Sequence, residues 1–275
     1  MKTLKKFIIY ILFPAAILLL SMLGDALALI AVIILYMAVF LLLEKENILK
    51  LMASHQFKKK NNLKALRYIY KAYRMKRSGI HTAVTFIYFL LKSGKYEKAG
   101  EIIVETEKRT LTPQEKNSLS LNKALFLWKT DRILESLELY GQLAVDDEST
   151  SLYSSYGYVA TLVDDPEKAL GVNLKAFEYN PESSAILDNL GLVYLKANDL
   201  DKAQEIYDRL MEKEPRFPEA YYNMSLLMER RYDMDESIYY LKKALEQDFD
   251  GLTTISREDV EKKLAHLKKL YGKAL

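Results

Sequence analysis

Two uncharged apolar stretches open the chain, and a long region with apolar residues at helical spacing follows them. The stretches cover residues 7–23 and 26–43, which are 17 and 18 residues long. At 1.5 Å of rise per residue, each helix would be about 26 Å long, against about 30 Å for the hydrocarbon core of a bilayer. The pattern predicts a membrane anchor over residues 1–43, with two spans joined at Gly24-Asp25.

Two alternatives to this hairpin are less favourable. A single re-entrant helix would bury Asp25 at mid-membrane, whereas a hairpin turn places it at the surface. A signal peptide cleaved after Ala26-Leu27-Ala28 would leave some fifteen further apolar residues on the mature chain. Pro14 lies inside the first span, where it should kink the helix without preventing the crossing.

Charge is distributed unevenly and predicts the orientation. Residues 44–79 contain eleven Lys or Arg and two Glu, a net charge of +9, while residues 150–275 carry −6. Because Lys- and Arg-rich flanks stay in the cytoplasm, both termini and the C-terminal region should be cytoplasmic, with two spans in the cell membrane. Lys2, Lys5 and Lys6 precede the first span and agree with this orientation. The segment 44–79 should contact anionic headgroups rather than nucleic acid, through Lys58, Lys59, Lys60, Lys64 and Arg67.

The remainder of the chain repeats a pattern with a period of 34 residues. Small residues recur at one position of a first helix, as Gly157, Gly191 and Ser225. A second series of small residues recurs on a second helix and comprises Ala169, Ala203 and Ser237. Two antiparallel helices can pack closely only where their crossing points are small, so the pattern predicts repeated helical hairpins.

This pattern resembles the tetratricopeptide repeat (TPR) family, whose 34-residue unit has these small positions and a proline near its end, as at Pro181 and Pro215. The resemblance implies an all-α fold, a right-handed α-solenoid of helix-turn-helix units. The units expected are 80–116, 117–149, 150–183, 184–217 and 218–251, the first two with an insertion and a deletion. With a hairpin anchor and no organelle-targeting pattern, the sequence favours a membrane-anchored bacterial protein.

The ends of the array depart from the repeat. Residues 44–79 form a basic degenerate unit whose first helix should continue from the second span, with Ala53, Ala65 and Ala72 at the small positions. Ile87 occupies a position where the family has a small residue. At the other end, Ser256 and Asp259 form a capping-box pattern, followed by Val260, Leu264, Leu267 and Leu270 at helical spacing. Residues 252–275 are therefore predicted to form a capping helix.

The sequence shows no arrangement of residues typical of catalysis or metal binding. It contains no Cys, and its three His, at positions 55, 81 and 266, have no ligand-like spacing. There is no Gly-rich phosphate loop, and the paired carboxylates fall at turns. We expect no catalytic or metal site, no cofactor and no small-molecule substrate, so the protein should not be an enzyme.

The TPR resemblance implies a concave groove lined by the first helix of each unit. An amide at one groove position could bind the backbone of an extended peptide, and aromatic side chains could add apolar contacts. Alternatively, Asn is simply tolerated on a helix surface. The residues expected to bind a partner are Tyr88, Asn122, Trp128, Tyr158, Asn189, Lys196, Tyr222, Asn223 and Arg230.

These features favour a membrane-tethered scaffold or adaptor that binds a protein partner, as a peptide or a helix, in the TPR groove. Two other functions remain compatible with the same features. The protein could be a regulator that senses a small peptide, or a structural subunit of a membrane complex.

Overall fold

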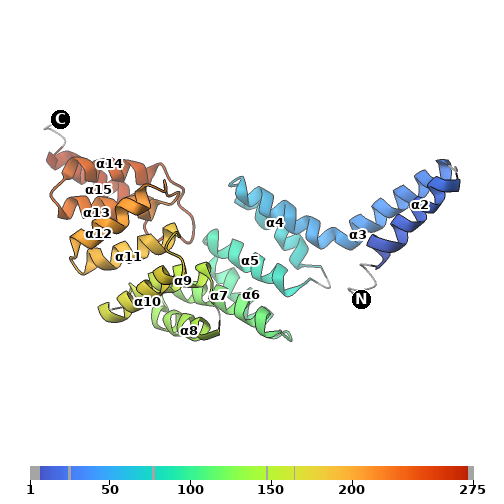
Figure 1. Cartoon of the computed structure of the whole chain (residues 1–275), viewed down its shortest axis with the longest axis horizontal. Helices are drawn as coiled ribbons and strands as arrows, with labels where there is room; N and C mark the ends of the chain where they lie inside the picture. The colour runs from blue at the N-terminus through green and yellow to red at the C-terminus, as the bar shows by residue number, and fades with distance from the viewer. Residues whose placement is uncertain (1–6, 24–25, 76–77, 147, 164, 272–275) are drawn as a thin grey trace. The chain divides into compact units, whose positions relative to one another are not determined.

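The structure is a computed structural model that describes residues 7–23, 26–75, 78–146, 148–163 and 165–271. Every element in these ranges is helical (Figure 1), so the all-α prediction is confirmed. The predicted turn at Gly24-Asp25 and the basic residues Lys2, Lys5 and Lys6 lie outside the described residues. The chain divides into two compact units, residues 1–89 and 90–275, and the boundary falls inside helix α5.

Two apolar helices lie side by side at the start of the first unit. A π-helical turn, η1 (Ile8–Leu12), leads into α2 (Phe13–Leu23), which packs against α3 (Ala26–Lys58). The ring centroids of Phe13 and Tyr36 are 5.4 Å apart. Only α3, among the described residues, is both long and apolar enough to cross a membrane, and none of its apolar window is buried.

Helix α3 runs without interruption from the apolar stretch into the basic segment, and then packs against α4 (Asn62–Tyr73). Ala53, Ala65 and Ala72 are fully buried, so the small side chains lie at helix contacts. Helix α5 (Ile80–Lys92) follows, and its Phe89 stacks on Phe57 with 4.2 Å between the ring centroids. Ile87, which departs from the TPR pattern, is also fully buried.

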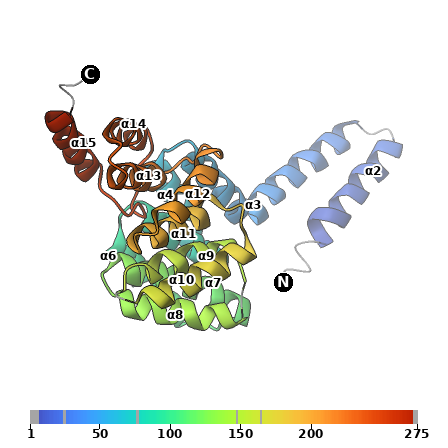
Figure 2. The same cartoon turned by 60° about the vertical axis from the view of Figure 1, so that its left-hand side comes forward.

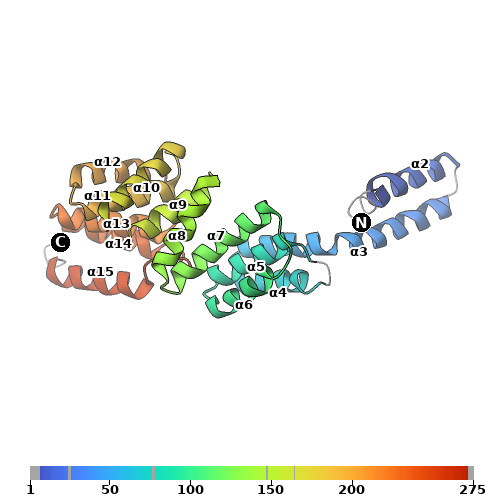
Figure 3. The same ribbon diagram turned by 90° about the horizontal axis from the view of Figure 1, so that it is seen from below.

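The second unit is a series of helix pairs stacked one after another (Figures 1, 2 and 3). Along one side, α7, α9, α11 and α13 contact each other in turn, and each first helix packs against the second helix that follows it. Capping helix α15 packs on α14. The bounds are α6 (Tyr96–Glu107), α7 (Pro113–Lys129), α8 (Ile133–Asp146), α9 (Thr150–Ala160), α10 (Pro166–Tyr179), α11 (Ser184–Lys196), α12 (Leu200–Met211), α13 (Pro218–Arg230), α14 (Met234–Leu245) and α15 (Arg257–Tyr271).

Five of the turns inside the helix pairs share one backbone feature, a residue in the left-handed region. This residue is Lys60, Gly94, Asp131, Asn198 or Tyr232, with φ between 59° and 68°. The next residue often caps the second helix of the pair: Asp199 and Asp233 accept hydrogen bonds from the backbone N–H three residues later. The turn chemistry therefore recurs with the helices, although only one of these positions is a glycine.

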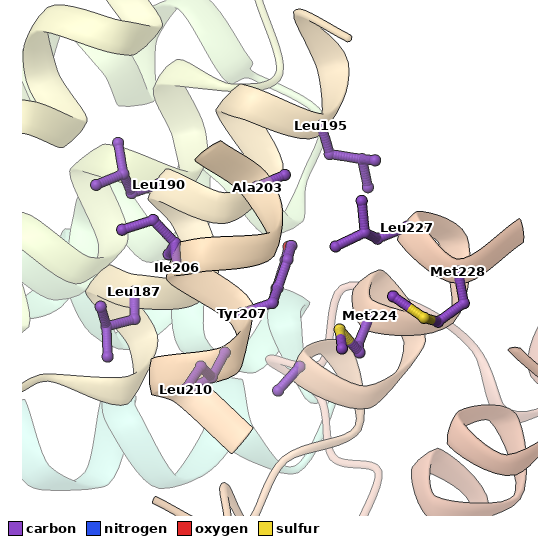
Figure 4. Close-up of a cluster of buried hydrophobic side chains, with 11 residues drawn as sticks. Leu187, Leu190, Leu195, Ala203, Ile206, Tyr207, Leu210, Met224, Leu227 and Met228 are labelled. Carbon is purple, nitrogen blue, oxygen red and sulfur yellow. The ribbon is translucent and has the colours of Figure 1, made fainter. Parts of the chain in front are cut away.

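The small residues of the repeat lie where two helices approach closely. A Cβ on Gly191 would come within 2.8 Å of the ring of Tyr207, and one on Gly157 within 2.4 Å of Asn173 Oδ1. Tyr207 is fully buried and lies between side chains of α11 and α13 (Figure 4). The glycines provide the space in which these large second-helix side chains pack.

The C-terminal helix begins with the predicted cap. The Asp259 N–H donates to Ser256 Oγ (3.0 Å), and Ser256 Oγ donates to the Asp259 carboxylate (2.6 Å). Val260, Leu264 and Leu267 are buried against α14, but Leu270 is 57% exposed. The apolar face of α15 thus ends one turn earlier than the spacing predicted.

Candidate functional site

The residues expected to line the groove fall mainly on the first helices of the second unit. We call the side of α7, α9, α11 and α13 that carries them the first-helix face. It includes Asn122, Trp128, Tyr158, Asn189, Lys196, Asn223 and Arg230. Tyr222, also on α13, packs against the buried cluster shared by α14 and α15. Tyr88 belongs to the first unit.

The asparagines of this face are buried and connect neighbouring helix pairs. Asn189 Nδ2 donates to the Ser154 carbonyl (2.7 Å), and Asn223 Nδ2 donates to Asp188 Oδ1 (3.0 Å). Each bond spans 35 residues, so it joins one unit to the preceding unit. Asn122, at the equivalent position, is 6% exposed. These bonds satisfy polar groups that would otherwise be buried without a partner.

Cations at the last position of the first helices form a second such series. Lys196 Nζ donates to the Thr161 carbonyl (2.5 Å), and Arg230 Nη1 donates to Asn198 Oδ1 (3.1 Å). Burial lowers the pKa of Lys196. Lys129 occupies the equivalent position in its unit, but its Nζ donates to the Thr253 carbonyl (3.0 Å), in the segment between α14 and α15.

That segment, residues 247–256, crosses the first-helix face, and we call it the strap. At its N-terminal side the Gly251 N–H donates to the Lys92 carbonyl (2.8 Å), and the Tyr96 hydroxyl donates to the Gly251 carbonyl (2.5 Å). The Lys92 ammonium pairs with the Asp250 carboxylate at 2.9 Å. The strap therefore contacts the end of α5 and the start of α6, more than 150 residues earlier in the chain.

At the other end of the strap, Thr254 binds to α9 and α13. The Thr254 N–H donates to Glu219 Oε1 (2.6 Å), and its side chain lies next to the Glu219 carboxyl and the Tyr158 hydroxyl. Tyr158 packs on Trp128, with 5.1 Å between the ring centroids, and Lys129 Nζ lies 4.9 Å from the centre of the Trp128 ring. Two of these side chains, Tyr158 and Trp128, were thus expected to line a groove.

Burial shifts the ionisation of the groups around Thr254. It raises the pKa of the Glu219 carboxyl and of the Tyr158 hydroxyl, and it lowers the pKa of Lys129. The Lys129 shift is opposed by the negative charges of Glu219 and Asp250. The strap and the first-helix face therefore meet in a partly desolvated, charged environment.

Gly251 is the point of closest approach between the strap and the helices. A Cβ at this position would lie 2.3 Å from the Leu91 carbonyl oxygen and 2.4 Å from the Gly94 nitrogen. Both are backbone atoms at the start of a turn, so they cannot rotate away as a side chain would. Only glycine fits here.

The sequence reasoning missed several residues of this arrangement. Lys92, Tyr96 and Glu219 were not among the predicted groove residues, and the strap was divided between the last repeat unit and the capping helix. One signal was present: eleven residues, 246–256, separate the last two helices, whereas four and six residues separate α10 from α11 and α12 from α13. Connections in helical bundles are usually two to eight residues long.

The basic residues of the first unit lie at the junction of α3 and α4. Lys58, Lys59, Lys60, Lys64 and Arg67 are all exposed. Because α3 is continuous, Lys58 lies about 22 Å along the helix axis from the end of the apolar stretch at Leu43. This is more than two Debye lengths at physiological salt, so these charges reach headgroups only if α3 is inclined to the membrane.

Within the described ranges, no three His, Cys, Asp or Glu side chains come together as metal ligands would. The polar groups of the strap region instead form hydrogen bonds and ion pairs within the protein. Its chemistry is that of recognition between a backbone segment and a helical surface.

Solved structures identify the fold. The Cut9 complex with Hcn1 aligns with a TM-score of 0.64 and 14% identity over 82% of this chain, which spans only 44% of that chain. The type IV pilus biogenesis factor PilW aligns with a TM-score of 0.60 and 12% identity, over 73% of this chain and 92% of its own. A tetratricopeptide repeat protein from Parabacteroides merdae aligns with a TM-score of 0.50 and 12% identity, over 82% of this chain and 99% of its own.

The chain has the fold of a TPR solenoid. No protein-family model matches the sequence, and no curated protein matches it. At these identities the structural similarity establishes the architecture, and function must be argued from the residues of this chain.

Proposed function

We propose that this protein is a membrane-tethered scaffold whose first-helix face binds a peptide or helix of a protein partner. One observation carries the proposal: a non-helical segment, the strap, is already bound to this face through its backbone, in a turn closed by the bond from the Thr253 N–H to the Asp250 carbonyl (3.1 Å). Its carbonyl and N–H groups are bound by Lys129, Tyr96 and Glu219. A surface that binds one non-helical segment through main-chain groups has the chemistry to bind another.

A hollow toward the C-terminal ends of α11 and α13 provides room for a partner side chain. It has a volume of about 400 Å³ and lies between α11 and α13, where Leu192, Leu226 and Arg230 line it. An apolar hollow next to a charged rim suits a segment with one apolar anchor.

In-cell photo-crosslinking tests this proposal. A photoreactive residue at Leu192 or Leu226 should capture one protein, while the same residue at Lys175, exposed on α10, should not. The captured protein should then bind the purified full-length chain, with a Kd raised at least tenfold by Leu192→Arg and unchanged by Lys175→Glu. Equal capture from all three positions would contradict the proposal.

We further propose that residues 7–23 and 26–43 both cross the cell membrane and leave the solenoid in the cytoplasm. Supporting features are the side-by-side packing of α2 and α3, their exposed apolar side chains, and the Lys-rich flanks. A single apolar helix or a signal sequence is the alternative.

The absence of native Cys makes the topology directly measurable. Single cysteines at Thr3, Asp25 and Gly171 should be labelled by a membrane-impermeant maleimide at Asp25 alone in intact cells, and at all three positions after lysis. Labelling of Gly171→Cys in intact cells would reverse the orientation, and an N-terminus starting after Ala28 would show cleavage of a signal sequence.

A further inference from the structure

The strap is longer than the connection between α14 and α15 requires. Its ends are fixed by Phe249 and Ile255, which pack against the apolar cluster of α14 and α15. Between them, residues 250–254 leave that cluster to contact α5, α6, α7, α9 and α13.

The central residues are held mainly by polar contacts. Gly251 through Thr254 are all half-buried, and the bonds that hold them to the helices use two backbone N–H groups and two carbonyls. Water or the backbone of another non-helical segment can replace each of these contacts. The strap can therefore leave the face without opening the hydrophobic core.

The contacts also define which sequence fits. An acidic residue pairs with Lys92, and the following residue must be glycine because of the close approach to Gly94 and the Leu91 carbonyl. Three residues beyond that glycine, a hydroxyl side chain binds between Tyr158 and Glu219. The site thus selects Asp-Gly followed by two residues and a Thr.

We propose that residues 250–254 are an intramolecular ligand of the first-helix face, and that a partner reaches this face by displacing them with a turn of the same chemistry. The identity of the partner rests on the proposed function. Occupancy of the face by the strap does not depend on it.

Two variants of the full-length protein in detergent micelles test the proposal. Gly251→Ala places a Cβ against backbone atoms and should expel the strap. Gly171→Ala, on an exposed face of α10 with no atom within 4 Å of the new Cβ, is the matched control. The probe is a fluorescein-labelled peptide, acetyl-DFDGLTTI-amide, which reproduces residues 248–255.

Hydrogen exchange reports the occupancy of the face. In the wild type and in Gly171→Ala, the N–H groups of Gly251 and Thr254 should be protected, because both donate to protein acceptors. In Gly251→Ala their exchange should accelerate at least tenfold, while the amides of α7 to α13 keep their protection. Unprotected strap amides in the wild type would overturn the proposal.

Fluorescence anisotropy measures how tightly the peptide binds the first-helix face after the strap has left it. The peptide should bind Gly251→Ala at least tenfold more tightly than the wild type or Gly171→Ala, and a peptide with Ala in place of its Gly should not bind. Equal affinity for all three proteins, with the strap released, would show that the strap is only a structural connection and would overturn the proposal.

A second variant is needed if Gly251→Ala also loses the hydrogen-exchange protection of helices α7 to α13, because the substitution would then have disturbed the fold. Replacing residues 248–255 by an eight-residue Gly-Ser segment removes the ligand without introducing a clash, and the same tighter binding of the peptide is expected. Photo-crosslinking from Leu192 separates the two proposals. If a partner is captured equally well with the strap bound and with the strap released, only the displacement step is contradicted. If no variant captures a partner, the scaffold function is contradicted.

Discussion

The Asn223 side-chain amide donates a 3.0 Å hydrogen bond to the carboxylate of Asp188, which lies 35 residues earlier and is only 5% exposed. Two successive first helices are joined by this bond. Burial raises the pKa of Asp188 from its ordinary 3.8 to about 7, and the negative charge of Glu219 adds to the shift. A residue that contributes to the stacking of units is therefore also a titrating group.

Asp188 should make the stability of the protein depend on pH. Because its folded-state pKa is raised, the protonated carboxyl stabilises the fold below about pH 4, and this contribution is lost as the pH rises to about 7. The free energy of unfolding should fall by up to about 4 kcal/mol over that interval. Urea titrations of the wild type and of Asp188→Asn, which keeps an acceptor for Asn223 and cannot ionise, should diverge as the pH rises. Parallel curves would contradict the assignment.

Asn189 should contribute to stability through its bond to the Ser154 carbonyl. Asn189→Ala leaves that buried carbonyl without its donor, so the free energy of unfolding should fall by about 1–3 kcal/mol. Glu205→Ala, exposed on α12, should change it by less than about 0.5 kcal/mol. If Asn189 contacted only a partner peptide, the variant would lose binding and keep full stability.

The close approach of α9 and α10 should make Gly157 intolerant of a side chain. Gly157→Ala directs a Cβ to within 2.4 Å of Asn173 Oδ1, whose amide also donates to the Gly157 carbonyl (3.0 Å). Thermal unfolding should show a loss of about 1–3 kcal/mol. Gly171→Ala, in open space on the next helix, should instead gain about 0.5–1 kcal/mol from the helix propensity of alanine. A destabilised Gly171→Ala would disprove the packing argument.

The core between α11, α12 and α13 should respond strongly to a cavity. Leu210 is fully buried within it (Figure 4), so Leu210→Ala should cost about 2–5 kcal/mol in chemical denaturation. Leu134→Ala, which removes a side chain that is 73% exposed, serves as the control and should cost less than about 0.5 kcal/mol. Similar losses at both sites would be incompatible with this core.

The helical architecture followed from local signals that the sequence carries in full. Gly191 and Ala203 recur with a period of 34 because every helix pair meets the same packing constraint, and that constraint acts on neighbouring residues. The capping box at Ser256 and Asp259 is equally local. The exposure of Leu270 was not predicted, because helical spacing gives a direction but not the point at which the neighbouring helix α14 ends.

The candidate site was predicted only in part. Trp128 and Tyr158 were expected on the face where they lie, since the period fixes which side of each first helix they occupy. The roles of Asn189 and Asn223 required knowing which carbonyl or carboxylate of the preceding unit they reach. Lys92, Tyr96 and Glu219 carried no signal, because their shared partner is the strap.

The sequence by itself determined the helices, their pairing, the small residues at their crossings and the apolar N-terminal stretches, because each depends on residues within about one period of 34. The tertiary structure alone decided that residues 250–254 lie on the first-helix face, with Gly251 against Gly94. That contact joins positions more than 150 residues apart, and it depends on the accumulated rotation of all the intervening helix pairs, which no local pattern records.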